Sequence, residues 1–465
     1  MKNLVFCFLL LNFTWTTFAQ KTITGDWHGL VSLGAQQLAL ILHVQQDGEK
    51  FLGTLDSPDQ KAFGINIDKL SFEKGVFHFE VTKIGVSYTG DLNDSVINGI
   101  FSQGYFKTPM ELKRQVIAKK IILRSQEPKA PFNYVQEDIN FQHQSTNFNL
   151  SGSVTKPLVG TNFPAVILIS GSGPQDRNEE IQGHKPFLII ADYLSKKGFL
   201  VLRYDDRGTG KSGGQFEGAT SIDLASDASS AIAYLKTRKD VDSQKIILIG
   251  HSEGGMLATM LAAEDKSIHA IVLLAGLGIS GYQVLLKQQA LIAKVNGVSD
   301  TEIEEARKIN AALFDVIIKA KDLESAKRPV EKFLTKTSKK LSKETLKEYE
   351  NEDAFVKAYM DAFLAPWMFT FLRYDPKNDF SKISCHVLAM NGSKDLQVSP
   401  QENLLAMNQF INNTGKKKEV LELPNLNHLF QHCETGNITE YGEIDETFAV
   451  DALEKIVRFL AATLP

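Results

Sequence analysis

Cysteine is scarce in this chain: its 465 residues include three, and only Cys385 and Cys433 lie beyond the N-terminal segment. Two cysteines are too few for a disulfide framework. Charge of one sign is not in excess either, because 51 basic residues stand against 55 acidic ones and no long basic block occurs. That balance argues against nucleic acid or an anionic membrane surface as the main partner. The other proportions, 43% hydrophobic and 23% charged, are ordinary for a folded protein, and the length allows two or three domains.

Long apolar runs are also lacking beyond the N-terminal segment. "MKNLVFCFLLLNFTWTTFAQ" places Lys2 before an apolar stretch from Leu4 to Phe13 and has small residues around Ala19. This pattern predicts a secretory signal peptide, residues 1–19, and hence an exported protein, periplasmic or secreted. A membrane anchor is the alternative, but the apolar stretch is short for a membrane span. After cleavage we expect no membrane span.

Residues 20–115 lack helical periodicity and contain short alternating segments separated by turn residues. "LALILHVQQDGEKFLGTL", "LSFEKGVFHFEV" and "VSYTGDLNDSVINGIFSQGYF" each indicate a hairpin, with turns at Asp47-Gly48, Lys74-Gly75 and Asn93-Asp94. We expect a small antiparallel all-β module, a barrel or a sandwich. "RSQEPKAPFNY", with two prolines and several charges, indicates that residues 116–134 are a linker.

From residue 135 to 465 apolar runs alternate with helical stretches. The runs are "PAVILIS" (164–170), "FLVLRY" (199–204), "KIILIG" (245–250), "AIVLLAG" (270–276) and "CHVLAM" (385–390). Runs that are apolar at every position suit strands covered on both faces, so we expect an α/β fold with a mostly parallel sheet. The interval of about 278–383 breaks the alternation and has helical patterning, with a capping box at Ser299 and Glu302. It predicts a helical insertion, placed as a cap on top of the sheet.

A serine between glycines ends one of these predicted strands. Gly250-His251-Ser252-Glu253-Gly254 fits G-x-S-x-G, follows "IILI" and precedes "GGMLATMLAA", which has the pattern of a helix. In such a strand–turn–helix the nucleophile adopts a strained backbone and its neighbours must be small. A glycine-rich turn with an incidental serine is the alternative. The position in the strand series favours Ser252 as a nucleophile.

A serine nucleophile needs a base and an acid that orients it, and behind such a turn the chain order is serine, acid, histidine. Asp395 follows the predicted strand "CHVLAM", and His428 follows the predicted strand "KEVLEL". Each therefore lies at the carboxyl end of a parallel strand, where ligand sites form. Other candidates are weaker because of their places along the chain: His432, His251, His269 and His386 as base, and Asp375 and Asp379 as acid.

An oxyanion hole needs two backbone N–H groups. We expect one from Glu253, which follows the nucleophile, and one from the loop "LISGSGPQDRN". Ser172 N–H is our choice in that loop, with Gly173 the near alternative. A plain turn is another interpretation. A phosphate-binding loop is disfavoured because "GSGPQDRN" has a proline and lacks the Lys-Ser/Thr of a P-loop.

These motifs carry a family resemblance. "GSGPQDRNE", "LRYDDRGTGKS", "GHSEGG", "PWMFTFLRYDP" and "NGSKDLQV" resemble, in this order, the α/β-hydrolase superfamily, with closest likeness to the EstD-type esterases grouped with serine aminopeptidase-like hydrolases. The Asp206-Arg207-Gly208 loop in "YDDRGTGKS" matches a hydrolase loop that is expected to be structural. "GDWHG" and the hairpin rhythm resemble the lipocalin-like β-modules ahead of some exported bacterial hydrolases.

The resemblance implies a serine carboxylesterase that cleaves carboxylic esters through an acyl-enzyme intermediate. Ser252, Asp395 and His428 match the triad, and the implied substrate is a small-molecule ester, with no metal and no organic cofactor. A serine aminopeptidase-like peptidase on the same scaffold is an alternative, and it would need an acid near the site to hold the substrate ammonium. A non-catalytic binding protein is a second alternative, against which the intact triad order argues.

Two further expectations concern single segments. "FLAPWMFTF" (363–371) precedes a predicted catalytic strand and either lines an acyl or alcohol pocket or belongs to the core. Cys385 begins its strand at one edge of the sheet and Cys433 follows His428 at the other. Since such a strand spans ~20 Å and a disulfide needs Cα atoms within ~7 Å, we expect these cysteines not to be joined.

Overall fold

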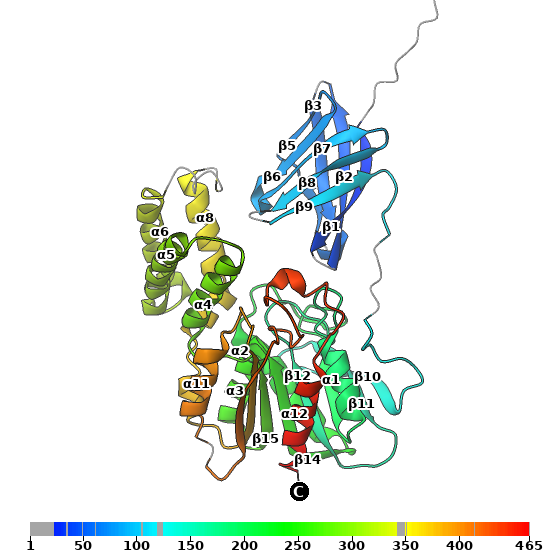
Figure 1. The fold of residues 1–465 in the computed structure, drawn as a ribbon, viewed down its shortest axis with the longest axis vertical. Helices are drawn as coiled ribbons and strands as arrows, with labels where there is room; N and C mark the ends of the chain where they lie inside the picture. Colours follow the sequence, from blue (N-terminus) through cyan, green and yellow to red (C-terminus); the bar gives the residue numbers. More distant parts are fainter. Residues whose placement is uncertain are drawn as a thin grey trace, which may run out of the picture. The chain divides into compact units, whose positions relative to one another are not determined.

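The computed structural model describes residues 23–33, 36–48, 50–60, 62–103, 106–118, 124–341, 349, 351–412 and 414–464. The predicted signal peptide, residues 1–19, lies outside the described residues. The chain divides into two compact units, one of residues up to Lys120 and one built on Ile121–Pro465 (Figure 1).

The first unit is one antiparallel sheet of nine strands, in the order β4-β3-β2-β1-β9-β8-β7-β6-β5. Its strands are β1 Gly25–Leu33, β2 Gln36–Asp47, β3 Lys50–Ser57, β4 Ala62–Asn66, β5 Lys69–Glu73, β6 Val76–Val81, β7 Val86–Asn93, β8 Val96–Gln103 and β9 Phe106–Lys113. The three predicted hairpins are confirmed, because β2–β3, β5–β6 and β7–β8 pair across the expected turns. The alternating pattern buries one face, with Trp27, Phe77, Phe79 and Tyr88 at its centre.

The second unit contains an eight-stranded sheet in the order β10-β11-β13-β12-β14-β15-β16-β17. Its strands are β10 Tyr134–Gln142, β11 Asn149–Pro157, β12 Phe163–Ile169, β13 Leu200–Tyr204, β14 Val241–His251, β15 Ile268–Leu274, β16 His386–Gly392 and β17 Lys418–Leu423. From β13 to β17 all neighbours are parallel, as the apolar runs predicted. The hairpin β10–β11 was not predicted, because β10 is an edge strand whose side chains are mostly exposed or half-buried and give no continuous apolar run.

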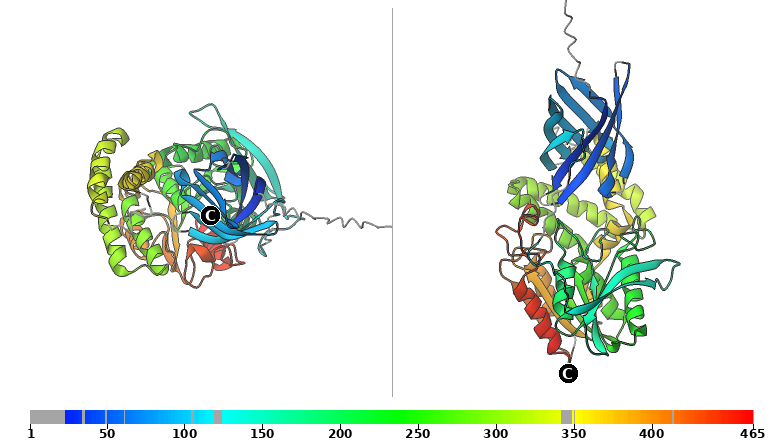
Figure 2. Two further views of the ribbon diagram at one scale, coloured as in Figure 1. Left: turned by 90° about the horizontal axis from the view of Figure 1, so that it is seen from above. Right: turned by 90° about the vertical axis from the view of Figure 1, so that its right-hand side faces the viewer.

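Both faces of this sheet are covered by helices (Figure 2). Ile246 and Leu248 of β14 pack in one core with helices α2 (Ser221–Thr237), α3 (Glu253–Glu264) and α11 (Pro400–Phe410). Ile247 and Ile249 of the same strand pack in the other core with α1 (Pro186–Ser195) and α12 (Val450–Ala461). This two-sided burial is the physical reason for the continuous apolar runs.

The interval between β15 and β16 is helical, as predicted. It contains α4 Gly281–Val295, α5 Asp300–Lys319, α6 Leu323–Ser338, α8 Glu352–Phe363, α9 Pro366–Arg373 and α10 Lys377–Phe380. The predicted capping box is present: Ser299 caps α5, and the Glu302 side chain bonds back to it. These helices share a core of their own, formed by Leu313, Phe314, Ile317, Val330, Leu334, Phe355 and Leu372.

The stretch predicted as a linker is only partly one. Arg124 is 4% exposed, and its guanidinium donates to the carbonyls of Ile444 at 2.8 Å and Gly442 at 2.6 Å. Gln126 exchanges hydrogen bonds with the backbone of Phe448. The prediction for residues 124–126 is therefore corrected: they form a strap bound to the second unit, because their side chains reach carbonyls far along the chain.

The expected absence of a disulfide between Cys385 and Cys433 is confirmed in the described part of the chain. Cys385 directly precedes β16, whereas Cys433 lies in the loop after β17. Across the described ranges no helix is both long and apolar enough to cross a bilayer.

Candidate active site

A strained turn joins β14 to α3. Ser252 has φ 53° and ψ −116°, a backbone conformation that residues other than glycine rarely adopt. The flanking glycines are required by close packing: a Cβ on Gly250 would lie 2.0 Å from the Gly254 carbonyl oxygen, and one on Gly254 would lie 2.0 Å from that of Ile169. Strain of this kind is kept where surrounding contacts fix it. Here Ser252 N–H donates to the Leu274 carbonyl of β15 at 2.8 Å.

Asp395 and His428 are brought together from the ends of two adjacent strands. His428 Nδ1 lies 2.8 Å from Asp395 Oδ2, and both residues are buried. The other oxygen of Asp395 accepts from the backbone N–H groups of Gln397 and Val398, at 2.8 and 2.9 Å. These bonds aim the carboxylate at the imidazole. Among the described contacts, Ser252 Oγ and His428 form no hydrogen bond; such bonds are often long before substrate binds.

The competing residues have other partners. His432 Nδ1 lies 2.8 Å from Glu446 Oε2 on an exposed part of the same loop. Asp379 accepts from the Tyr374 hydroxyl and from Lys382, and Asp375 caps the backbone of Lys377. None of these contacts places the three side chains beside Asp395 or Ser252.

The loop after β12 passes next to the turn. A Cβ on Gly171 would lie 3.3 Å from Ser252 Cβ, so the backbone runs close to the proposed nucleophile. Ser172, expected to supply an oxyanion donor, follows at once, and Gly173 adopts φ 91°. Glu253, the other expected donor, is the first residue of α3, where no intrahelical carbonyl can accept its N–H.

Buried acids hold this loop in place. Asp206 accepts from Ser170 Oγ and from Gln175 N–H, each at 2.9 Å. Burial raises the pKa of Asp206 to about 8, although these two bonds oppose the shift. Its neighbour Asp205 accepts from the guanidinium of Arg177 at 2.8 Å. Burial raises the pKa of Asp205 too, but Arg177 and backbone N–H groups outweigh it and hold the pKa below its ordinary value.

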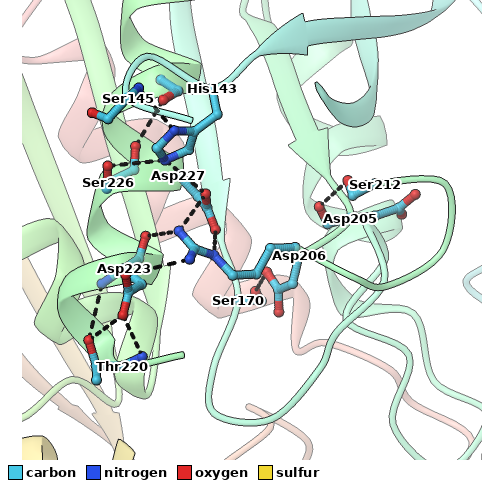
Figure 3. Close-up of polar contacts among 12 residues, drawn as sticks. His143, Ser145, Ser170, Asp205, Asp206, Ser212, Thr220, Asp223, Ser226 and Asp227 are labelled. Carbon is cyan, nitrogen blue, oxygen red and sulfur yellow. Dashed lines mark hydrogen bonds and ion pairs between the residues drawn. The ribbon is translucent and has the colours of Figure 1, made fainter. Parts of the chain in front are cut away.

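Arg207, next along the chain, supports the scaffold. Its guanidinium donates to Asp227 of α2 at 2.7 and 2.9 Å. Figure 3 shows Asp227 beside His143, whose Nε2 lies 3.3 Å from Asp227 Oδ1, and shows Asp206 against Ser170. These contacts join the loop after β13 to α2 and to the end of β10, in keeping with a structural role for Arg207.

The side chain of Glu253 was not singled out by the sequence. One oxygen, Oε1, accepts from Ser221 Oγ at 2.5 Å and from the indole N–H of Trp367 at 2.7 Å. The other, Oε2, is buried and has no hydrogen-bond partner among the described residues. Burial raises the pKa of this carboxyl. Trp367 belongs to α9, so the aromatic stretch 363–371 contacts the residue after Ser252, while Phe371 of the same stretch belongs to the core.

A second buried pair was also missed. His251 Nδ1 lies 2.9 Å from Glu179 Oε1, and His251 Nε2 lies 2.9 Å from the carbonyl oxygen of His428. Nothing in "PQDRNEE" distinguishes Glu179 from a solvated acid. Within the described part of the chain, His, Cys, Asp and Glu side chains form no group of three or more suited to a metal ion.

The sequence profile of the family described as X-Pro dipeptidyl-peptidase (S15 family) matches residues 133–429. Esterase EstD of Thermotoga maritima is 37% identical over 136 residues, 29% of this chain and 32% of that protein. The uncharacterized protein YfhR of Escherichia coli O157:H7 is 30% identical over 127 residues, 24% of this chain and 43% of that protein. The chain therefore spans less than half the length of these two relatives.

Solved structures are similar as well. The hypothetical protein PA2218 from Pseudomonas aeruginosa is 17% identical, with a TM-score of 0.44 over 74% of this chain and 99% of that one. The Pyrococcus furiosus esterase Pf2001 is 16% identical, with a TM-score of 0.42 over 71% of this chain and 92% of that one.

The EstD match confirms the resemblance noted in the sequence. The profile match extends over more than half of the 465 residues and includes Ser252, Asp395 and His428. The chain belongs to the S15 family of α/β-hydrolases, whose profile is described as X-Pro dipeptidyl-peptidase.

Proposed function

We propose that this protein is a serine hydrolase that cleaves carboxylic esters through an acyl-enzyme. The observation that carries the proposal is the hydrogen bond between Asp395 and His428, together with the strained backbone of Ser252. The three residues follow β16, β17 and β14, so all of them lie at the carboxyl ends of parallel strands of one sheet. A buried acid bonded to Nδ1 fixes the histidine tautomer that leaves Nε2 able to accept a proton.

Acylation follows from these positions. Ser252 Oγ attacks the ester carbonyl carbon while His428 Nε2 takes its proton, and Asp395 stabilises the resulting imidazolium. The N–H groups of Glu253 and Ser172 bind the oxyanion of the tetrahedral intermediate; in comparable enzymes one such donor is worth ~3 kcal/mol. When the intermediate collapses, His428 returns the proton to the leaving alcohol.

Deacylation reverses the roles. A water molecule attacks the acyl carbonyl as His428 removes its proton, and the acid product leaves as Ser252 Oγ regains the proton. The helical insertion is proposed to act as a cap over this site. In support, Trp367 of α9 bonds directly to the side chain of Glu253, next to the nucleophile.

Ester cleavage is favoured by the similarity to Esterase EstD. A peptidase is the second candidate, because the matching family is described as X-Pro dipeptidyl-peptidase. It would need an acid for the substrate ammonium. Glu253 is an acid at the site, but its oxygens are turned toward Ser221 and Trp367 or buried. That arrangement favours the ester.

The deciding experiment compares p-nitrophenyl esters of graded acyl length with aminoacyl- and Xaa-Pro-nitroanilides. We expect kcat/KM to be higher for at least one ester than for every anilide. Faster anilide turnover would replace the esterase with a peptidase, and chain-length preference would outline the acyl pocket.

Variants test the residues. Ser252→Ala is expected to remove ester hydrolysis while leaving the Tm unchanged within a few degrees, and Asp395→Asn to lower kcat by ~10⁴-fold, since the histidine tautomer is lost. Asp379→Asn is the matched control and should retain wild-type turnover. An active Ser252→Ala protein would refute the assignment of the nucleophile; an inactive Asp379→Asn protein with an active Asp395→Asn protein would move the acid.

A further inference from the structure

A second acid–histidine pair lies next to the proposed triad. Glu179 is 1% exposed and His251 is 5% exposed, so the pair is shut off from solvent. Glu179 belongs to the loop after β12, and His251 is the last residue of β14. Their contact is 2.9 Å, between Oε1 and Nδ1. The acyl-transfer steps above use neither side chain.

The other contacts of the pair reach two parts of the proposed machinery. Glu179 Oε1 also accepts from Gly171 N–H at 2.7 Å, in the residue before the proposed oxyanion donor Ser172. His251 Nε2 lies 2.9 Å from the carbonyl oxygen of His428, the proposed base. The two histidine rings are 4.8 Å apart between centroids. One continuous line of hydrogen bonds therefore joins the oxyanion loop to the base.

Chemistry fixes how many protons this line holds. A carbonyl oxygen only accepts, so His251 Nε2 must carry a hydrogen. The Gly171 N–H only donates, so Glu179 Oε1 must accept from it. The remaining contact, Nδ1 to Oε1, needs one proton between its two atoms. The pair thus satisfies all three bonds only when it holds that shared proton.

We propose that Glu179 and His251 are positioning residues. Through one shared proton they hold the oxyanion loop and the catalytic histidine in a fixed position relative to each other. This inference rests on the proposed function. It assigns no bond-breaking step to the pair. Its role is geometric: misplacing a reacting group by ~1 Å can cost ~10²-fold in rate.

The charges around the pair give the role a pH dependence. Burial lowers the pKa of His251, but Glu179 outweighs it and the pKa is raised overall; Asp395, from the loop after β16, acts in the same direction. His428 faces His251 from the loop after β17, and Glu179 contributes to the raised pKa of Asp206 in the loop after β13. A raised pKa means that the shared proton is kept to a higher pH than in an ordinary histidine and is lost as pH rises through that pKa. We therefore expect kcat to fall on the alkaline side.

An isosteric variant tests the proposal. In Glu179→Gln the amide can accept from Gly171 or donate to His251, but one atom cannot do both. We expect kcat on a p-nitrophenyl ester to fall ~10–100-fold with KM within ~3-fold of wild type, because the loss affects the transition state. The alkaline fall of kcat should disappear in this variant. Phenylboronic acid, which forms a tetrahedral adduct with the serine, should bind correspondingly more weakly.

His251→Gln should show the same split between kcat and KM, and His143→Gln is its matched control. His143 is another buried histidine beside a carboxylate, Asp227, and it contacts no residue of the proposed site among its described bonds. We expect His143→Gln to lose stability but keep kcat and its pH profile.

The wild-type protein and Ser252→Ala are measured first. If the wild type hydrolyses no ester, the proposed function fails. If the wild type does hydrolyse an ester, two results contradict the positioning role. Either Glu179→Gln and His251→Gln keep wild-type kcat, or they lose no more kcat than the control His143→Gln loses at a similar decrease in Tm. Should Glu179→Gln fail to fold, the wild-type profile still decides, because constant kcat up to alkaline pH contradicts the shared proton.

Discussion

At the scale of single residues, two adjacent aspartates hold the same loop by opposite means. Asp206 is bound by neutral donors, Ser170 Oγ and Gln175 N–H, and burial raises its pKa to about 8. Asp205 is bound by the cation of Arg177, which keeps its pKa below the ordinary value despite burial. The first is therefore mainly protonated at pH 7 and the second ionised, since a buried charge persists only when it is paired.

This difference predicts opposite effects of pH. The stabilisation from Asp206 is present below the ordinary aspartate pKa and is lost as pH rises through about 8. An asparagine imitates the protonated acid, so Asp206→Asn should flatten the decline of the free energy of unfolding between pH 5 and 9; each unit of removed pKa shift is worth ~1.4 kcal/mol. Denaturant unfolding at several pH values measures this.

The neighbour serves as the control. Asp205 contributes above its ordinary pKa and loses its contribution as pH falls through the lowered one. Asp205→Asn should therefore lower the free energy of unfolding at pH 7 by ~1–3 kcal/mol, because Arg177 loses its ionised partner. If both variants respond alike to pH, the assignment of one protonated and one ionised aspartate is wrong.

At the scale of elements, one short helix links the helical insertion to the nucleophile turn. Helix α9 begins at Pro366, and its second residue, Trp367, donates to Glu253 Oε1. The Trp367 ring also stacks on Phe371 at 5.2 Å between centroids. The insertion has an apolar core of its own, and Trp367 and Phe371 also pack in the core beside the sheet, so α9 connects the insertion to the start of α3 by both apolar and polar contacts.

Trp367→Phe keeps the ring and removes the donor. We expect kcat/KM for esters to fall ~3–10-fold. A buried acceptor that loses its hydrogen-bond partner costs ~1–3 kcal/mol, and we expect part of this free energy to raise the activation barrier, because Glu253 also supplies an oxyanion donor. Trp27→Phe is the matched control, because Trp27 donates to the Ile23 carbonyl at 2.7 Å within the β-module. Equal kinetics for the two variants would show that α9 does not influence the turn.

At the scale of the whole molecule, side-chain hydrogen bonds show where in the chain the second unit begins. Arg124 and Gln126 are bound to the backbone between Gly442 and Phe448, although they belong to the stretch that resembled a linker. The second unit therefore includes this strap. The β-module has a core of its own and contributes no residue to the proposed triad.

Two shortened chains test this boundary. Residues 121–465 should fold and hydrolyse a short ester with kcat/KM near that of a chain that also contains the β-module, residues 20–465. Residues 130–465, which lack the strap, should melt at least ~5 °C lower, because several hydrogen bonds worth ~1 kcal/mol each are lost. A folded but inactive 121–465 chain would show that the β-module completes the site, and equal melting temperatures would show that the strap is dispensable.

The sequence by itself determined what depends on neighbouring residues. Strands buried on both faces produce continuous apolar runs, so the parallel strands could be predicted. The turn at Ser252 requires glycines because neighbouring backbone approaches closely, so the turn could be predicted too, and with it the places of Asp395 and His428 after their strands. The edge strand β10, whose side chains are mostly exposed or half-buried, left no comparable signal.

Only the tertiary structure decided which polar side chains meet. Glu179 pairs with His251, Trp367 with Glu253, and Arg124 with the carbonyls of Gly442 and Ile444. Each of these pairs joins residues that are far apart in the chain. Hydrophobic periodicity and turn chemistry are local properties of the chain. The partner of a buried polar or charged group, in contrast, depends on which distant loops the fold brings together. Because burying an unpaired charge costs much free energy, these partners determine the positions of the residues in the site.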